Sequence, residues 1–446
     1  MRIEELEIQN FKGLKNVCMT NIPNIVVIAG PTGVGKSSIL EAIACFKEKT
    51  APYHSWNKPG LVCIDSTIAE IKITFQLFPE DLEYLLGVHK MDNVEAKQTG
   101  SIKIAPNGSL IENNVPKPLK ILLSLYDRIN YPSMGIFEYL NPYRLLKSKE
   151  LNSLNLSSLT TQEEKIRRIT YIDQKFDQTK DYLAQLRFHD LQNLDKKLNE
   201  GQEKISKTEV GDSLKPIKDI FNKFLSPKKF FGVDLSSSPI KILIQTPEGK
   251  VDIDYLSSGE KEILSVFANL LKLKLKNSII LFDEPDLHLN QEIERKIIDT
   301  LKGLGENNQF WIATHSFGIM NSVDFKELYR LEHFRGENQI VRVFDDEEKF
   351  STFKSVAGDA GLITLGEKIV FLEGIEYTDK HILETWFEDQ KDKITFVSSG
   401  SVSNVLRISD KILKLIQTST KFNFFFDLTR LRKLFFYYIY DFVKKK

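Results

Sequence analysis

The sequence predicts an α/β protein built on a mixed β-sheet, with a short helical-hairpin insertion and a smaller α/β segment toward the C-terminus. Ile25 to Ala29 is an unbroken apolar run, which is typical of a buried parallel strand, and helical spacing of apolar residues follows from Ser38. Ser278 to Phe282 and Phe310 to Thr314 are apolar runs of the same kind. Functional side chains are therefore expected where these predicted strands end.

Composition and charge are those of an ordinary folded protein of 446 residues, with 41% hydrophobic and 27% charged residues. Lys+Arg and Asp+Glu are equal at 61 each, so bulk charge does not indicate nucleic-acid binding, although a local basic groove stays open. The three cysteines have no metal-ligand spacing, which indicates free thiols in a reducing compartment. The first segment, from Met1 to Glu5, is charged, which is unlike a signal peptide. The apolar stretch from Leu434 to Val443 is too short to span a bilayer. We expect a cytoplasmic protein without a membrane partner.

Four stretches are expected along the chain: the N-terminal part of the main domain (1–150), a helical insertion (151–230), the C-terminal part of the main domain (231–355) and a separate α/β segment (366–446). In the first stretch, Ile68 to Phe75 alternates as an edge strand, and Ser101 to Ile104 followed by Asn107-Gly108 predicts a hairpin. From Thr160 to Leu225 the polar, helical pattern predicts two antiparallel helices of roughly 40 Å each.

The segment after the first buried strand carries the strongest chemical signal, a complete G-x-x-x-x-G-K-S. Its glycines let backbone N–H groups turn toward phosphate oxygens, and the helix that begins at Lys36 adds its positive end to the same anion. We expect Lys36 to reach the β- and γ-phosphates of ATP and the Ser37 hydroxyl to ligate Mg²⁺. The predicted nucleotide-binding residues here are Gly30, Pro31, Thr32, Gly33, Val34, Gly35, Lys36, Ser37 and Ser38.

An acidic pair, Asp283-Glu284, lies at the end of the second apolar run. Ligands bind at the carboxyl ends of strands in open α/β sheets, so this position suits catalysis. We expect Asp283 to hold Mg²⁺, directly or through water, and Glu284 to orient and deprotonate the attacking water. Together with the phosphate-binding loop earlier in the chain, the acidic pair indicates a site of nucleotide hydrolysis.

Two further segments complete the predicted site. Ser257, Ser258 and Gly259 open a helix shortly before the acidic strand. In one interpretation they form a second anion site with the N-terminal amides of that helix, and in the other they are a plain helix cap. His315 follows the third apolar run, where it would contact the γ-phosphate, although a lone histidine is usually structural.

These elements, in this order, resemble the Walker A, signature, Walker B and switch-histidine motifs of the ABC ATPase superfamily. The resemblance implies an ATPase with ATP and Mg²⁺ as cofactors, in which the signature segment of one copy covers the nucleotide on the Walker A loop of the other. Ser258 stands where transporters usually have glycine, and Ser-Ser-Gly-Glu is similar to the soluble branch of SMC, RecF and OLD (overcoming lysogenisation defect) proteins. Phe11-Lys12-Gly13-Leu14 and the segment from Glu284 to Leu289 resemble that branch as well, and Tyr143-Arg144 resembles an OLD-like motif. No glutamine is assigned as the Q-loop.

The C-terminal third has a pattern of its own. Phe371-Leu372-Glu373-Gly374 resembles the first motif of the TOPRIM fold, whose glutamate helps to bind metal at a nuclease centre. The Asp-x-Asp pair of that family is here Asp427-Leu428-Thr429, so Glu373 and Asp427 are expected to be the remnant of a metal site. The chain ends soon afterwards, and we expect a truncated or degenerate TOPRIM-like segment without intrinsic nuclease activity.

The resemblance implies an ATPase subunit of a bacterial anti-phage complex, similar to OLD-type ATPases and to the ATPase subunits of Septu systems. It covers roughly 1–45 and 250–430, and the residues between are matched only in layout. It implies a homodimer or higher homo-oligomer with an HNH-type nuclease as partner. A self-contained OLD-type ATP-dependent endonuclease and a RecF-like DNA-repair ATPase are the alternatives. A transporter ATPase is disfavoured by Ser258.

Overall fold

The computed structural model describes residues 1–51, 59–125, 135–142, 151–153, 179–200, 211–286, 289, 291–334, 337–345, short pieces between 348 and 356, 368–372 and 394–398. The chain divides into two compact units, Met1–Phe344 and Asp345–Lys446. The helical insertion expected at 151–230 falls inside the first unit, and the two units separate at Phe344, ahead of the boundary expected near 355–366. The division into four stretches remains a prediction.

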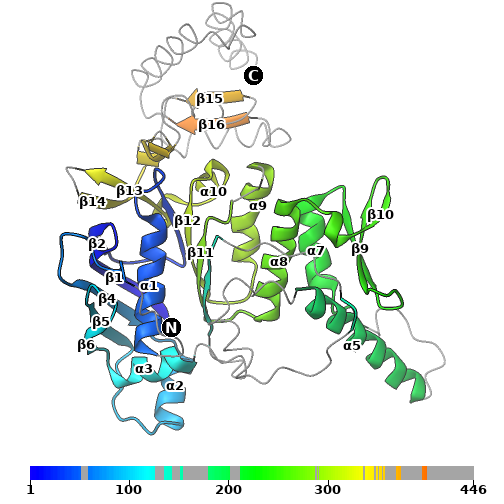
Figure 1. Cartoon of the computed structure of the whole chain (residues 1–446), viewed down its shortest axis with the longest axis horizontal. Helices are drawn as coiled ribbons and strands as arrows, with labels where there is room; N and C mark the ends of the chain where they lie inside the picture. Colours follow the sequence, from blue (N-terminus) through cyan, green and yellow to red (C-terminus); the bar gives the residue numbers. More distant parts are fainter. Residues whose placement is uncertain are drawn as a thin grey trace, which may run out of the picture. The chain divides into compact units, whose positions relative to one another are not determined.

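A mostly parallel sheet forms the centre of the first unit (Figure 1). Among the described residues it has six strands in the order β14-β13-β3-β12-β11-β7, and only β14 runs antiparallel to its neighbour. Every residue of β3, β11 and β12 is buried, which confirms the three strands predicted from apolar runs. The strands are β3 (Ile25–Ala29), β7 (Phe137–Leu140), β11 (Ile279–Asp283), β12 (Gln309–Thr314), β13 (Leu328–Phe334) and β14 (Glu337–Arg342).

A second, antiparallel sheet has the order β2-β1-β4-β5-β6. The hairpin expected around Asn107-Gly108 is confirmed, because β5 and β6 pair antiparallel on either side of it. The edge position expected for Ile68 to Phe75 is wrong, because β4 lies between β1 and β5. Alternation of apolar residues reports one buried face, and a central strand and an edge strand share that property. The strands are β1 (Arg2–Phe11), β2 (Leu14–Met19), β4 (Ala69–Gln76), β5 (Lys97–Ile104) and β6 (Leu110–Asn114).

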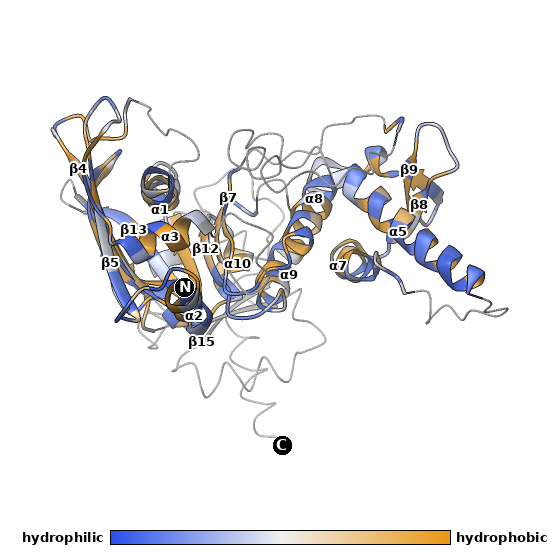
Figure 2. Cartoon of the chain, turned by 90° about the horizontal axis from the view of Figure 1, so that it is seen from below, coloured by the Kyte–Doolittle hydropathy of each residue, from blue (hydrophilic) through white to orange (hydrophobic). Residues whose placement is uncertain are grey.

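Helix α1 (Lys36–Thr50) lies between the two sheets and contacts β11 and β12 of one and β1, β4 and β5 of the other (Figure 2). Leu40, Ile43 and Phe46 are fully buried in the core that fills this space. The sheets are also joined at β12, because the Gln309 side chain accepts from Ile3 N at 2.9 Å and donates to Ile3 O at 2.8 Å. Helix α1 therefore packs between two sheets that are themselves connected.

Two helices are described in the stretch from Thr160 to Leu225 where helices were expected, and residues 160–178 and 201–210 of this stretch lie outside the described residues. The described ones are α5 (Thr179–Asn199), with 21 residues, and α7 (Lys215–Leu225), with 11, which corresponds to about 32 Å and about 17 Å at the α-helical rise. Helix α7 packs against α8 (Ser258–Lys272) and buries Phe221 and Phe224. The polar pattern predicted helix correctly, but not this packing onto the body of the unit.

A small antiparallel sheet has the order β10-β9-β8. The short 3₁₀ helix η2 follows its last strand, β10, and leads to α8. The other elements of the first unit are helices around the sheets. The strands of the small sheet are β8 (Lys229–Asp234), β9 (Lys241–Thr246) and β10 (Gly249–Asp252), and the helices are η2 (Ile253–Tyr255), α2 (Pro79–Gly87), α3 (Lys117–Leu125), α9 (Gln291–Lys302), α10 (Phe317–Asn321) and η3 (Phe325–Glu327).

The second unit is described mainly by two parallel strands, β15 (Lys368–Leu372) and β16 (Ile394–Ser398). Glu373 and Asp427 lie outside the described residues, as does Tyr143-Arg144. In the part of the chain that the structure describes, no helix is both long and apolar enough to cross a membrane.

Candidate nucleotide-binding site

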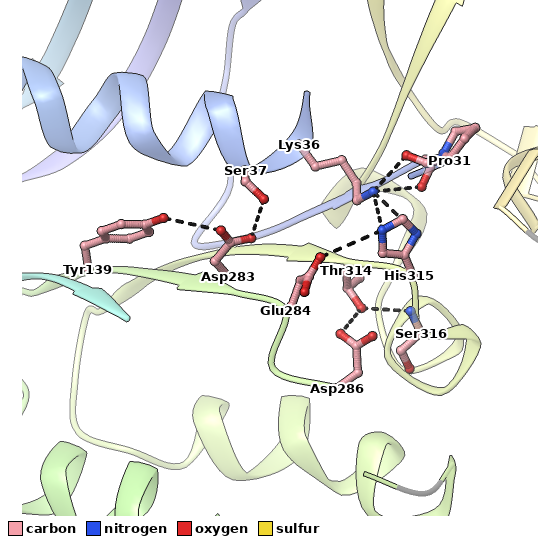
Figure 3. A network of polar contacts seen from close by, with 11 residues as sticks. Pro31, Lys36, Ser37, Tyr139, Asp283, Glu284, Asp286, Thr314, His315 and Ser316 are labelled. Carbon is pink, nitrogen blue, oxygen red and sulfur yellow. Dashed lines mark hydrogen bonds and ion pairs between the residues drawn. The ribbon is translucent and has the colours of Figure 1, made fainter. Parts of the chain in front are cut away.

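Parallel strand order brings three of the predicted motifs to one edge of the central sheet. In the register, Asp283 at the end of β11 lies opposite Ala313 of β12, and Thr314 lies opposite Ala29 of β3. The phosphate-binding loop continues from Ala29 into α1, and His315 follows β12. Figure 3 shows that the side chains from these strand ends point toward one another. The predicted convergence is therefore found within a single chain.

Two glycines of the loop are required by close approach or by backbone conformation. A Cβ atom on Gly30 would lie 2.2 Å from the carbonyl oxygen of Leu331 on β13, which no side chain tolerates. Gly35, the residue before α1, has φ 107°, a conformation that favours glycine. The loop thus packs directly on β13.

Lys36 reaches back over the loop into the site. Its Nζ donates to the carbonyl oxygens of Gly30 at 2.9 Å and Pro31 at 3.0 Å, and lies 2.8 Å from Nε2 of His315. Burial lowers the pKa of Lys36 from its usual 10.5 to about 8, against the attraction of nearby carboxylates. A buried cation whose hydrogen bonds go to neutral groups is suited to receive an anion, since a phosphate would supply the missing countercharge.

Asp283 and Ser37 form a pair of hard oxygen ligands. The Ser37 hydroxyl donates to Oδ1 of Asp283 at 2.9 Å, and the Tyr139 hydroxyl donates to Oδ2 at 3.3 Å. Asp283 is 1% exposed, and burial raises the pKa of its carboxyl from 3.8 to about 6. A buried carboxylate beside a serine hydroxyl fits Mg²⁺, which prefers oxygen ligands and offsets the desolvated charge. Tyr139, from β7, was not predicted, because no motif marks it.

Glu284 follows the last residue of β11, and its side chain lies toward His315 (Figure 3). Its φ is 45°, in the left-handed region, while its N–H still donates to Ala313 O at 2.9 Å. An unfavourable backbone held in place by the sheet is a common feature of functional residues. One carboxylate oxygen of Glu284 lies 4.0 Å from Nε2 of His315. Burial lowers the pKa of His315, and the positive charge of Lys36 lowers it further, so the ring is neutral at pH 7.

A second row of polar groups fixes the backbone around His315. Thr314 Oγ1 donates to Oδ1 of Asp286 at 2.5 Å and accepts from Ser316 N at 2.8 Å. Ser316 Oγ caps α10 by accepting from Ile319 N and donates to Oε2 of Glu294 on α9 at 2.6 Å. Asp286 lies in the segment from Glu284 to Leu289 that resembles the soluble branch of SMC, RecF and OLD proteins. Glu294 was not predicted, since its link to Ser316 arises only in the folded chain.

Asn338 of β14 braces the loop from the far end of the sequence. Its side chain is buried, donates to Val34 O at 2.9 Å and accepts from Lys15 N at 3.3 Å. The bond to Val34 spans 304 residues, so sequence patterns gave no sign of it. It holds the middle of the phosphate-binding loop to the β1–β2 hairpin and to β14.

Ser257, Ser258 and Gly259 do not join this cluster. Ser257 is the N-cap of α8, and its Oγ and N–H form a capping box with the backbone N–H and side chain of Glu260. Figures 1 and 2 show α8 on the other side of β12 and α9 from α1. The helix-cap interpretation is therefore correct for a single copy, while Ser257 and Ser258 stay exposed.

The fold and this site define an ATPase of the ABC/SMC class. The chain belongs to the family described as "AAA domain, putative AbiEii toxin, Type IV TA system", whose model matches residues 25–321. This membership establishes nucleotide binding and ATPase activity as the class of function. The predicted ABC-type α/β head is confirmed.

Several known proteins are similar to the chain. The "Retron Ec83 probable ATPase" of Escherichia coli is 22% identical over 75% of this chain and 72% of its own length. The "Septu protein PtuA" of Bacillus thuringiensis is 30% identical over 22% of this chain and 28% of its own length. The "Chromosome partition protein Smc" of Mesomycoplasma hyorhinis is 26% identical over 40% of this chain and 18% of its own length. The resemblance to Septu and SMC ATPases is thereby confirmed, whereas the OLD assignment stays a prediction.

Among solved structures, the Smc head domain with a coiled coil and joint from Pyrococcus yayanosii is 14% identical, covers 79% of this chain and 98% of that chain, and has a TM-score of 0.47.

Proposed function

We propose that the chain is the ATP-hydrolysing subunit of a cytoplasmic anti-phage defence complex, that two copies close on ATP and Mg²⁺, and that this closure controls a separate HNH-type nuclease. One observation carries the proposal: the loop, the acidic pair and the histidine converge in one copy, while Ser257 to Gly259 begin a helix elsewhere in it. The similarity to a retron ATPase and a Septu protein supports the role in defence.

In the proposed site, ATP binding breaks the contacts that Lys36 makes with Gly30 O, Pro31 O and His315. Lys36 Nζ then donates to phosphate oxygens, whose negative charge raises the pKa of the ammonium group again. This movement leaves His315 able to donate to a γ-phosphate oxygen. Ser37 and Asp283 would hold Mg²⁺, which supplies positive charge to the phosphate oxygens.

Hydrolysis is assigned to Glu284. Its carboxylate orients a water molecule and accepts a proton as the water oxygen bonds to the γ-phosphorus and the bond to the β–γ bridging oxygen breaks. Inorganic phosphate and ADP leave, and the proton leaves Glu284 to solvent. The signature residues of the second copy, Ser257 to Gly259, close the site over the γ-phosphate.

Mixing two inactive variants tests whether the site is shared between copies. Lys36→Ala removes the loop lysine, and Ser258→Arg blocks the signature surface, so each variant alone should show almost no ATP hydrolysis. An equimolar mixture should regain roughly a quarter of wild-type turnover, because about half of the dimers carry one intact site of two. Phosphate release measured on the mixture checks this.

The matched control mixes Lys36→Ala with the double variant Lys36→Ala/Ser258→Arg. No pairing of these chains contains an intact site, so this mixture should stay inactive. If the mixture of the two single variants is as inactive as the control, the shared site is refuted.

The purified chain alone, with Mg²⁺ or Mn²⁺, should leave DNA and RNA uncut, because the carboxylate set expected around Glu373 and Asp427 is incomplete for two-metal cleavage. Cleavage should appear when an HNH-type partner is added, and it should change with ATP. A gel-based cleavage assay of each combination checks this. Metal-dependent cleavage by the chain alone that is lost in Glu373→Ala would instead favour a self-contained endonuclease.

A further inference from the structure

The residue two positions before the signature serine is an exposed aromatic side chain. Tyr255 is 83% exposed, the highest value among the exposed large aromatic side chains of the described residues, while its neighbour Leu256 is 5% exposed. Tyrosine is enriched among the residues that dominate the binding energy of interfaces, because its ring buries a large apolar area and its hydroxyl can find a hydrogen-bond partner.

The backbone presents Tyr255 beside the signature. Leu256 and Ser257 both have extended conformations, with φ and ψ of −68° and 152° and of −64° and 165°. Neighbouring side chains of an extended segment leave the chain in different directions. Here Leu256 is the one that enters the core, while Tyr255 on one side of it and Ser257 on the other face solvent.

The turn that carries Tyr255 is held from several directions. Asp252 caps η2 by accepting from Asp254 N at 2.9 Å, and Leu256 N donates to Ile253 O at 3.1 Å. Lys180 of α5, itself buried, pairs with the Asp254 carboxylate at 2.7 Å. A side chain on so fixed a backbone loses little conformational freedom when it is covered, which makes it an efficient contact.

We infer that Tyr255 packs against a second copy of this chain, at the rim of the nucleotide held by that copy's phosphate-binding loop. The inference rests on the proposed function, in which the surface around Ser257 is covered only when two copies close. Consecutive residues are about 3.8 Å apart, so a partner surface that reaches Ser257 also reaches Tyr255 two positions away. The ring buries apolar area there, and its hydroxyl suits a border that also holds ribose and phosphate oxygens.

The test measures dimerisation of the full chain by sedimentation in the presence of Mg²⁺ and a non-hydrolysable ATP analogue. Tyr255→Ala should raise the dimer dissociation constant about 10- to 100-fold, the loss expected of an interface hot spot. Tyr255→Phe keeps the ring and should stay within a few-fold of wild type. Phe231→Ala removes another exposed aromatic, 51% exposed on β8, and should leave the dissociation constant unchanged.

Two readouts separate this inference from folding and from the proposed function. Analogue binding to the monomer and the thermal unfolding midpoint should be the same in Tyr255→Ala and wild type, because the side chain is exposed and lies outside the loop site. If wild type dimerises with the analogue and Tyr255→Ala does so equally tightly, the inference is wrong and the proposed function stands. An equal loss in Phe231→Ala also overturns the inference. If wild type itself does not dimerise, both the inference and the proposed function fail.

Discussion

A Lys36→Ala variant should lose ATP binding, and its kcat/KM for ATP hydrolysis should fall at least about 10³-fold. Lys36 is the buried cation of the site, and its three hydrogen-bonding contacts are with neutral groups that ATP phosphates would replace. Calorimetric titration with ATP and Mg²⁺ measures the binding, and phosphate release measures the turnover. Tight ATP binding by this variant would refute the assignment of the loop.

The variant should nevertheless be folded. Because the folded-state pKa of Lys36 is lowered to about 8, the charged lysine destabilises the folded protein at all pH values below that, and the penalty is relieved only as pH rises toward 10.5. Removing the charge at pH 7 should therefore not lower the free energy of unfolding. Lys15→Ala, an exposed lysine of the adjacent hairpin, is the matched control and should bind ATP as wild type does.

Asp283→Asn should abolish hydrolysis and, at pH 8, stabilise the protein by up to about 3 kcal/mol. Burial raises the pKa of Asp283 from 3.8 to about 6, and the neighbouring Glu284 adds to the effect. Between these two pH values the folded state binds more protons than the unfolded state, so stability falls as pH rises, and the full penalty is present above pH 6. Asparagine carries no charge and can still accept from Ser37.

Urea unfolding of both proteins at several pH values checks this prediction. The stability difference should be largest at pH 8 and should shrink between pH 6 and pH 4, where the wild-type carboxyl becomes protonated. Asp65→Asn, which changes an exposed carboxylate, should show no such difference. Wild-type stability at pH 8, or retained hydrolysis, would contradict the role given to Asp283.

The sequence was sufficient where one local pattern determined the structure. The strand from Ile25 and the loop and helix that follow it are continuous in the chain, and the hairpin around Asn107-Gly108 closes on itself, so both could be predicted. Apolar runs also identified the strands that end at Asp283 and Thr314. Their meeting at one edge followed from the general rule for parallel sheets.

Contacts between distant parts of the chain could not be predicted. Tyr139 meets Asp283 across 144 residues, and Asn338 meets Val34 across 304. Nothing in a pattern around Asn338 distinguishes a buried amide that braces a loop from a polar residue on an edge strand. The same limit applies to β4, whose alternation reveals a buried face but not the presence of β5 on its second edge.

The cap at the start of α8 has a consequence for how a triphosphate could approach it. Ser257 uses a lone pair of Oγ to accept from Glu260 N, so the hydroxyl proton remains available to donate to an incoming oxygen. The Glu260 carboxylate, which would otherwise repel a polyanion, is occupied by Ser257 N at 2.9 Å and by the ammonium group of Lys228 at 2.7 Å. The helix start thus keeps its structural cap and its acidic residue while it stays electrostatically open to negative charge.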